Sequence, residues 1–185
     1  MFCIKCGNKT TLELIPGDTF SRDVCKVCNY IHYVNPKIIV GALALKDDKV
    51  LLCKRDINPG KGKWTLPSGF MEMGESIEQG AKREAKEEAN LELNLNMLYG
   101  TYSIPRIGQV LFIYVANIVN EDFRAADETI EVKLFGVSEI PWENIAFPSV
   151  EFFLRNYKRD FSNGRNFTFH SNFLDQYNID ELALI

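Results

Sequence analysis

The chain has 185 residues, a length that suits one compact domain with room for a small additional unit. Hydrophobic residues make up 46% and charged residues 25% of the sequence, which is ordinary for a globular protein and argues against a fibrous or disordered one. The net charge of −4 provides no basic surface for general nucleic-acid or membrane binding, and no apolar run reaches membrane-spanning length. Because Met1 leads almost directly into a cysteine motif, we expect no signal peptide and a reducing, cytoplasmic location.

Four of the five cysteines form two CxxC pairs near the start of the chain, Cys3 with Cys6 and Cys25 with Cys28. The segment between the pairs suits a hairpin that returns the second pair to the first. Four thiolates at this spacing are typical of a tetrahedral structural zinc site. Disulfides are an alternative that a reducing compartment disfavours, and a redox dithiol would need only one pair. Since so short a segment buries little apolar surface, we expect metal binding to supply much of its folding free energy.

The first strands of the main domain are expected from residue 37 onward. The apolar run Lys37–Leu45 predicts a largely buried strand, and the Asp47-Asp48 pair predicts a turn. Val50–Arg55 then completes a hairpin. The lone Cys53 in this second strand is expected to be a small buried hydrophobe.

Residues 77–89 predict an amphipathic helix without proline. Small or apolar residues recur at every fourth position, at Ile77, Ala81, Ala85 and Ala89. This stripe should pack against a core. Glu84, Glu87 and Glu88 lie off the stripe at relations i, i+3 and i+4, so their carboxylates crowd one patch and repel one another. One interpretation is a solvated helix face. The other is a site for divalent cations, because hard ions such as Mg2+ need several oxygen ligands.

The later strands and helix are predicted from the same patterns of apolar residues, alternating in strands and recurring every three to four residues in helices. Strands are predicted over Leu91–Tyr102, Val110–Val119 and Glu131–Val137, and an amphipathic helix over Val150–Phe161. The remaining tail is rich in aromatic residues and ends in the apolar sequence LALI. We expect this tail to pack on the body of the protein or on a partner.

The segment from residue 69 to 91, GFMEMGESIEQGAKREAKEEANL, resembles the Nudix box G-x5-E-x7-R-E-U-x-E-E-x-G-U, where U is apolar. Eight residues fall on its positions: Gly69, Glu75, Arg83, Glu84, Ala85, Glu87, Glu88 and Leu91. The second glycine of the box is Asn90 here; asparagine enters the left-handed backbone region readily, so a helix can still end there. So many positions at fixed spacing make a chance match far less expected than for a short glycine pattern. The preceding W-x-L-P-x-G segment is similar to the one in many Nudix proteins.

The resemblance implies an α+β fold, an α/β/α sandwich built on a mixed β-sheet and preceded by a small zinc ribbon. Periodicity alone indicates only a mixture of helices and strands. We therefore expect a zinc ribbon over residues 1–34, a hydrolase domain over 35–162 and a C-terminal tail over 163–185.

The resemblance also implies a pyrophosphohydrolase with a catalytic Mg2+ or Mn2+ ion. Such ions neutralise phosphate charge and lower the pKa of a bound water. The metal ligands carried over from the family are the side chains of Glu84, Glu87 and Glu88 and the carbonyl of Gly69. Arg83 is expected to orient the glutamates, and Glu75 to support the loop. Which carboxylate acts as general base stays open, because in this family the base comes either from the box or from another loop.

The ribbon, the WTLPSGF segment and the later IPRIGQVLFIYVANI segment resemble ribbon-bearing enzymes related to ADP-ribose pyrophosphatases and plant FAD pyrophosphatases. We therefore expect hydrolysis of ADP-ribose, FAD or both, with release of AMP. NADH pyrophosphatases are the alternative, although their SQPWPFPxS signature is replaced here by YSIPRIGQ. Candidates for the substrate pocket are Arg55, Tyr102, Ile104, Pro105, Arg106 and Gln109. An ordinary loop between strands, or a surface charge in the case of Arg55, is the alternative for each of them.

The alternative from a different functional class is a non-catalytic protein that senses a nucleotide and uses the ribbon as an interaction module. Degenerate box glutamates would favour it, and all the box glutamates are present. The partners expected are a small-molecule nucleotide and, by similarity to related enzymes, a second copy of the chain, with no membrane and no general nucleic-acid partner.

Overall fold

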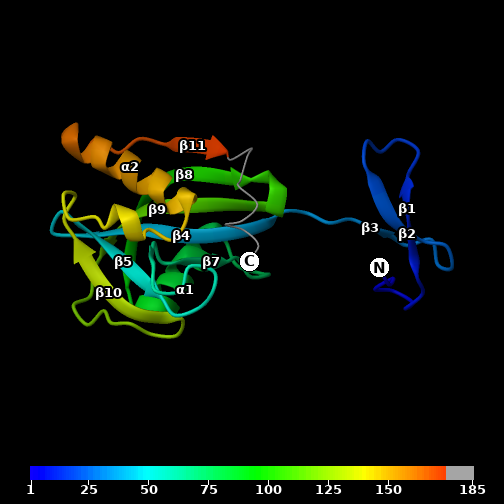
Figure 1. Ribbon diagram of the computed structural model, residues 1–185, viewed down its shortest axis with the longest axis horizontal. Helices are drawn as coiled ribbons and strands as arrows, with labels where there is room; N and C mark the ends of the chain where they lie inside the picture. Colours follow the sequence, from blue (N-terminus) through cyan, green and yellow to red (C-terminus); the bar gives the residue numbers. More distant parts are fainter. Residues whose placement is uncertain (174–185) are drawn as a thin grey trace. The chain divides into compact units, whose positions relative to one another are not determined.

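The computed structural model describes residues 1–173 (Figure 1). The chain divides into two compact units, Met1–Pro36 and a larger unit that begins at Lys37. Within the described residues, no helix combines the length and the apolar character that crossing a bilayer requires.

The first unit is a three-stranded antiparallel sheet in the order β1-β2-β3. Its strands are β1 (Thr10–Leu14), β2 (Ser21–Cys25) and β3 (Ile31–His32). β1 and β2 form the hairpin expected between the two cysteine pairs, with Thr10 opposite Cys25 and Leu14 opposite Ser21. The hairpin thereby returns the second cysteine pair to the first, as predicted.

The larger unit is built on a mixed sheet whose strands follow the order β10-β5-β4-β9-β8-β11. These strands are β4 (Lys37–Lys46), β5 (Lys49–Arg55), β8 (Leu93–Ile104), β9 (Gln109–Ile118), β10 (Thr129–Phe135) and β11 (His170–Phe173). Two short strands lie off this path, β6 (Trp64–Thr65) on β5 and β7 (Ser68–Phe70) on β4. β4 runs parallel to β9, and β11 runs parallel to β8, while the other pairs are antiparallel. The expected mixed sheet is confirmed.

Two helices cover opposite faces of this sheet, α1 (Ile77–Ala89) and α2 (Pro148–Ser162), which Figure 1 shows below and above the strands. The α2 face carries the larger core, with Leu43, Tyr99 and Phe153 fully buried. The α1 face is lined by small residues, among them Ala42 and Ala85. The short side chains bring α1 close to the sheet, and the sandwich predicted from the resemblance is confirmed.

The ends of α1 explain why this helix has the predicted bounds. Ser76 caps the first turn, where its hydroxyl accepts a hydrogen bond from the Gln79 N–H while the Ser76 N–H donates to the side-chain oxygen of Gln79. Asn90 ends the helix with a φ of 51°, in the left-handed region. Its N–H donates to the carbonyls of Ala85 and Lys86. The departure from glycine at this box position is therefore accommodated.

Other element boundaries differ from the sequence prediction by a few residues. β8 starts and ends two residues later than expected, and β10 lies two residues earlier. α2 begins at Pro148 rather than Val150, because proline suits the first helical position, where no N–H is needed. Two short 3-10 helices, η1 (Pro105–Ile107) and η2 (Trp142–Asn144), were not predicted.

The tail packs on the body of the larger unit over the part that is described. The Phe167 ring stacks on Tyr157 and meets Tyr99 edge-on, and β11 pairs with β8 from Gly100 to Ser103. Side-chain periodicity carries no signal for this parallel pairing. The apolar end of the tail lies outside the described residues.

Candidate active site

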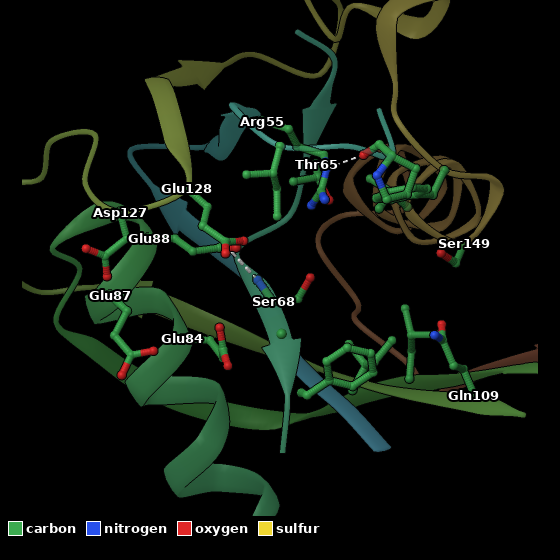
Figure 2. A pocket seen from close by; sticks show the side chains of 18 of the residues that line it. Arg55, Thr65, Ser68, Glu84, Glu87, Glu88, Gln109, Asp127, Glu128 and Ser149 are labelled. Atoms are coloured by element: carbon green, nitrogen blue, oxygen red, sulfur yellow. Dashed lines mark hydrogen bonds between the residues drawn. The ribbon is translucent and has the colours of Figure 1, made fainter. Parts of the chain in front are cut away.

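A cavity of about 630 Å3 lies beside the N-terminal end of α2 and the side of α1 that contacts β7 (Figure 2). Carboxylates gather along one side of it, at Glu84, Glu87, Glu88, Asp127 and Glu128. Apolar side chains from four strands, together with Phe147 and Val150, form much of the remaining wall. A cavity with one acidic side and one apolar side suits a cation-bound phosphate attached to an organic group.

Glu84 is held against β7 by the absence of a side chain at Gly69. The residue is 9% exposed, and a Cβ at Gly69 would collide with its carboxylate. Burial raises the pKa of Glu84, while hydrogen bonding and charge from Arg83 oppose the rise. Gly69 therefore makes the space that brings its own backbone and the Glu84 carboxylate together.

Glu88 is as buried as Glu84, with 9% of its surface exposed. Its Oε2 accepts a hydrogen bond of 3.0 Å from the backbone N–H of Ser68. Burial raises the pKa of Glu88 to about 8; the Ser68 hydrogen bond and the Arg55 charge oppose this rise, and the charges of Glu84 and Glu128 add to it. A carboxylate this hard to ionise gains much from a nearby cation.

Arg83 connects the glutamates of the box. Its Nε and Nη2 donate to the two carboxylate oxygens of Glu75, over 3.0 and 2.8 Å. Its Nη1 donates to Glu84 over 2.7 Å and to Glu87 over 2.9 Å. The hydrogen bonds from Arg83 lower the pKa of Glu75 to about 2, and Glu75 also accepts from the Glu72 N–H, which ties the loop before α1. Arg83 thus contacts three glutamates of the box and Glu75 contacts the loop; the roles expected of the two residues stay predictions.

The carboxylates share one cavity wall but do not converge on one point. Among the described residues, the four cysteines are the only group of three or more His, Cys, Asp or Glu whose ligand atoms all approach within 4.8 Å. Two of the carboxylates, Glu84 and Glu87, are bridged by the Nη1 of Arg83, which donates to both. Carboxylate oxygens are nevertheless the donors that Mg2+ and Mn2+ prefer, so the residues present fit such an ion.

The structure places the residues expected to bind substrate in two groups. Arg55, Ile104 and Gln109 line the cavity. Tyr102, Pro105 and Arg106 do not. Tyr102 is only 2% exposed because α2 covers it, with the Phe152 ring 5.3 Å away. Pro105 and Arg106 belong to η1, outside the lining residues.

Several cavity residues were not found from the sequence. Asp127 and Glu128 come from the loop before β10, and Figure 2 shows the Glu128 carboxylate beside that of Glu88. Ser149 comes from the first turn of α2, and Phe70 from β7. An acidic pair in a loop and a serine at a helix start have common structural explanations, so neither gave a functional signal.

The four cysteines of the first unit form a second site. The Sγ atoms of Cys3 and Cys28 are 3.6 Å apart, and those of Cys6 and Cys25 are 3.4 Å apart, and each cysteine is a free thiol. A zinc ion bound by four sulfurs at about 2.3 Å sets sulfur–sulfur separations of about 3.8 Å. Hydrogen bonds from Asn8 lower the pKa of Cys6, whereas, against a hydrogen bond from the Tyr30 backbone, burial and the neighbouring thiols raise the pKa of Cys28, so a metal ion would be needed to hold both as thiolates. The donor set and its spacing fit zinc.

Comparison with known proteins agrees with this geometry. Residues 35–155 match the family model described as the NUDIX domain, and residues 1–34 match the one described as Nudix N-terminal. The chain belongs to the Nudix family. It is a Nudix pyrophosphohydrolase, and the expected enzyme class is confirmed. The comparisons therefore favour the enzyme over the alternative of a non-catalytic nucleotide sensor.

Relatives of this Nudix enzyme carry two kinds of name. It is 33% identical over 147 residues to the ADP-ribose pyrophosphatase of Methanocaldococcus jannaschii, a match that covers 76% of this chain and 86% of the relative. It is 28% identical to the NAD-capped RNA hydrolase NudC of Vibrio parahaemolyticus, but spans only 52% of that protein. A NUDIX hydrolase from Nitrosomonas europaea has 44% sequence identity and superposes with a TM-score of 0.91, over 95% of this chain and 99% of the other.

Nudix enzymes use a divalent metal ion and act on nucleotides. In this chain Glu84, Glu87 and Glu88 would hold the ion, with Gly69 packed against the Glu84 carboxylate. When bound, the ion neutralises phosphate charge and lowers the pKa of a water. The chain's own residues fix these carboxylates, because Arg83 donates to Glu84 and Glu87 and the Ser68 N–H donates to Glu88.

Proposed function

We propose that this enzyme hydrolyses the pyrophosphate bond of ADP-ribose, FAD or both, using Mg2+ or Mn2+, and releases AMP. The observation that carries the proposal is the cavity, in which the box carboxylates and Arg55 border the same space. Two negatively charged phosphates are stabilised by metal ions and by hydrogen-bond donors. In this cavity the box carboxylates can bind the metal ions, and Arg55 supplies hydrogen-bond donors. The similarity to the ADP-ribose pyrophosphatase of M. jannaschii, over most of both chains, supports this substrate class.

The apolar part of the cavity supports a nucleoside as one end of the substrate. Phe70 is 47% exposed and lines the cavity, with the Lys37 ammonium 5.2 Å from its ring centroid. An exposed aromatic ring gives a flat surface on which a base can stack. Gln109, which lines the same cavity, offers an amide that can both donate to and accept from a base or a ribose.

Glu128 is our candidate for the general base. Its carboxylate lies beside Glu88 in Figure 2, yet it belongs to the loop before β10 and not to the box. A base that is not itself required as a metal ligand can take a proton from the attacking water while the helix glutamates hold the ion. Glu128→Gln should lower kcat while leaving metal affinity nearly unchanged, and an equal loss of both would place Glu128 among the metal ligands instead.

We further propose that the four cysteines hold a structural Zn2+ ion and that the chain is organised as a ribbon over 1–34, a hydrolase domain over 35–162 and a tail over 163–185. The cysteine spacing supports the zinc ion. A homodimer stays a prediction, and light scattering after size-exclusion chromatography tests it.

A dinucleotide such as NADH, or the NAD cap of an RNA, is the second candidate substrate. The observation that favours it is the similarity to NudC proteins, although the chain spans only about half of the V. parahaemolyticus protein. The sequence YSIPRIGQ, in place of the signature of the NADH-specific enzymes, argues against it.

One substrate panel distinguishes these proposals. Purified enzyme with Mg2+ or Mn2+ is incubated with ADP-ribose, FAD, NADH, NAD, diadenosine polyphosphates and an NAD-capped RNA, and the nucleotide products are separated and quantified. We expect AMP from ADP-ribose or FAD at a kcat/KM at least about tenfold above that for NADH. Preferred cleavage of NADH or of the capped RNA would contradict our first choice in favour of the second.

A further inference from the structure

The N-terminus of α2 forms part of the cavity wall and carries free hydrogen-bond donors. The first N–H groups of any helix lack partners within the helix, and no side chain caps α2. Pro148 has no N–H, and the Glu151 N–H donates to the Phe147 carbonyl over 3.0 Å. The N–H groups of Ser149 and Val150 therefore have no partner in residues 1–173, and both residues line the cavity. The positive end of the helix dipole faces this space.

The side chain of Ser149 points to the same place, which is an independent observation. Ser149 is only 3% exposed, and Figure 2 shows its hydroxyl directed toward the cavity. No hydrogen bond to this hydroxyl is found in the described part of the chain. Among residues 1–173, every side-chain nitrogen or oxygen that is fully enclosed has a hydrogen-bond partner. Because the Ser149 hydroxyl has none, it is not fully enclosed, and it opens onto the cavity that Ser149 lines. An unpaired hydroxyl that opens onto a cavity can donate to, or accept from, a ligand bound there.

A positive charge lies next to these donors. The guanidinium of Arg55 stacks over the Phe147 ring, with its Cζ 5.0 Å from the ring centroid. Its Nε donates to the Pro59 carbonyl over 2.7 Å, which fixes the group beside the start of α2. The one acidic residue in the first turn, Glu151, pairs with Arg155. Donors and positive charge therefore meet at this part of the wall.

We propose that the α2 N-terminus, the Ser149 hydroxyl and Arg55 bind a phosphoryl group of the substrate without the help of a metal ion. Helix N-termini with free N–H groups are suited to phosphate oxygens, and a hydroxyl and a guanidinium complete such a site. In Figure 2 Ser149 lies across the cavity from the carboxylates of α1. The two phosphoryl groups of one pyrophosphate then have different surroundings: one is bound by metal ions, and the other by the hydrogen-bond donors at the α2 N-terminus and Arg55. This difference fixes which end of the substrate lies near α1 and which near α2. The inference rests on the proposed function only in placing the pyrophosphate in this cavity.

The test compares phosphate binding in Ser149→Ala, Ser149→Thr and Ser162→Ala. Ser162 is an exposed serine at the other end of the same helix, where its hydroxyl donates to the Lys158 carbonyl, so it serves as the control. Full-length protein is dialysed free of Mg2+ and Mn2+ and titrated calorimetrically with inorganic phosphate, AMP, ribose 5-phosphate and adenosine. Binding of Mn2+ is measured separately by electron paramagnetic resonance.

We expect Ser149→Ala to weaken the binding of inorganic phosphate about tenfold, as for a lost hydrogen bond to a charged group, and Ser149→Thr and Ser162→Ala to bind as the parent does. A matching loss with AMP or with ribose 5-phosphate identifies the half of the substrate that the site holds. In turnover with Mg2+, KM should rise about tenfold at a nearly constant kcat, because the contact exists before the reaction starts. Mn2+ affinity should not change, and the unfolding temperature should stay equal or rise.

Two results would overturn the inference. One is an unchanged affinity of Ser149→Ala for every phosphate ligand, together with an unchanged KM. The other is adenosine binding that weakens in Ser149→Ala as much as AMP binding does, which would assign the hydroxyl to the nucleoside. Because these titrations need no turnover, they stay informative even if the substrate panel shows a different pyrophosphate to be the preferred one.

Discussion

Replacing Gly69 with alanine tests whether the position of the Glu84 carboxylate controls catalysis. The added Cβ would lie 2.5 Å from Cδ and 2.6 Å from Oε1 of Glu84. Since carbon atoms in contact are about 3.5 Å apart, the carboxylate must move by about 1 Å. Gly69 pairs with Val40 in the sheet and does not have a positive φ, so the strand itself accepts alanine. The perturbation therefore acts on the glutamate and not on the fold.

The expected loss follows from this displacement. Metal–ligand distances tolerate deviations of about 0.2 Å, so a shift of about 1 Å removes Glu84 as a ligand or distorts the site. A misplacement of this size lowers rates about 100-fold, which corresponds to about 2.7 kcal/mol of transition-state stabilisation. We expect kcat/KM with ADP-ribose and Mg2+ to fall about 100-fold and Mn2+ affinity to fall with it.

Gly136→Ala is the matched control. Its added Cβ would also approach a glutamate carboxylate, that of Glu139 at 3.0 Å, but Glu139 is exposed and can move away. Neither residue lines the cavity. Steady-state kinetics, Mn2+ binding and thermal unfolding are measured for both variants. A Gly69→Ala protein that unfolds at the parent temperature and keeps the parent kcat/KM would refute the placement of Glu84 at the metal.

Three further predictions follow from the two sites. Because Glu88 must ionise to bind a cation and its pKa is raised to about 8 without one, Mn2+ affinity should rise up to about tenfold from pH 7 to pH 9, whereas Glu88→Gln should show no such rise. Arg83→Lys keeps the charge but not the fork that holds Glu75, so Mn2+ affinity should drop about tenfold; parent-like affinity would show that the fork is dispensable. Cys3→Ser should lose the zinc found in the parent by elemental analysis, and full retention of zinc would contradict the four-cysteine site.

The elements that could be predicted are those defined by local sequence. α1 has the predicted bounds because its alanine stripe, its Ser76 cap and its Asn90 end all lie within one continuous segment, residues 76–90. The parallel pairing of β4 with β9 joins residues about seventy positions apart, from Lys37 opposite Gln109 onward. Side-chain alternation predicts the strands but not which strands pair, so the sequence analysis expected a mixed sheet only from the family resemblance and predicted no strand order.

The same division applies to the site. Glu84, Glu87 and Glu88 were found because one helix presents them at a fixed spacing. Tyr102 was misplaced relative to the cavity because nothing in its strand shows that α2 will cover it. Glu128 and Ser149 reach the cavity only through tertiary packing, so their own neighbourhoods in the sequence carry no sign of it.

The most direct test of metal-dependent pyrophosphate hydrolysis at the α1 carboxylates is AMP release from ADP-ribose by the parent enzyme and by Glu87→Gln. Both are assayed with and without Mg2+, after circular dichroism has shown that the variant is folded. We predict Mg2+-dependent release by the parent and a loss of about 1000-fold or more in Glu87→Gln, because an amide is a much poorer ligand for Mg2+ than a carboxylate. Near-parent, Mg2+-dependent release by the folded variant would contradict the account.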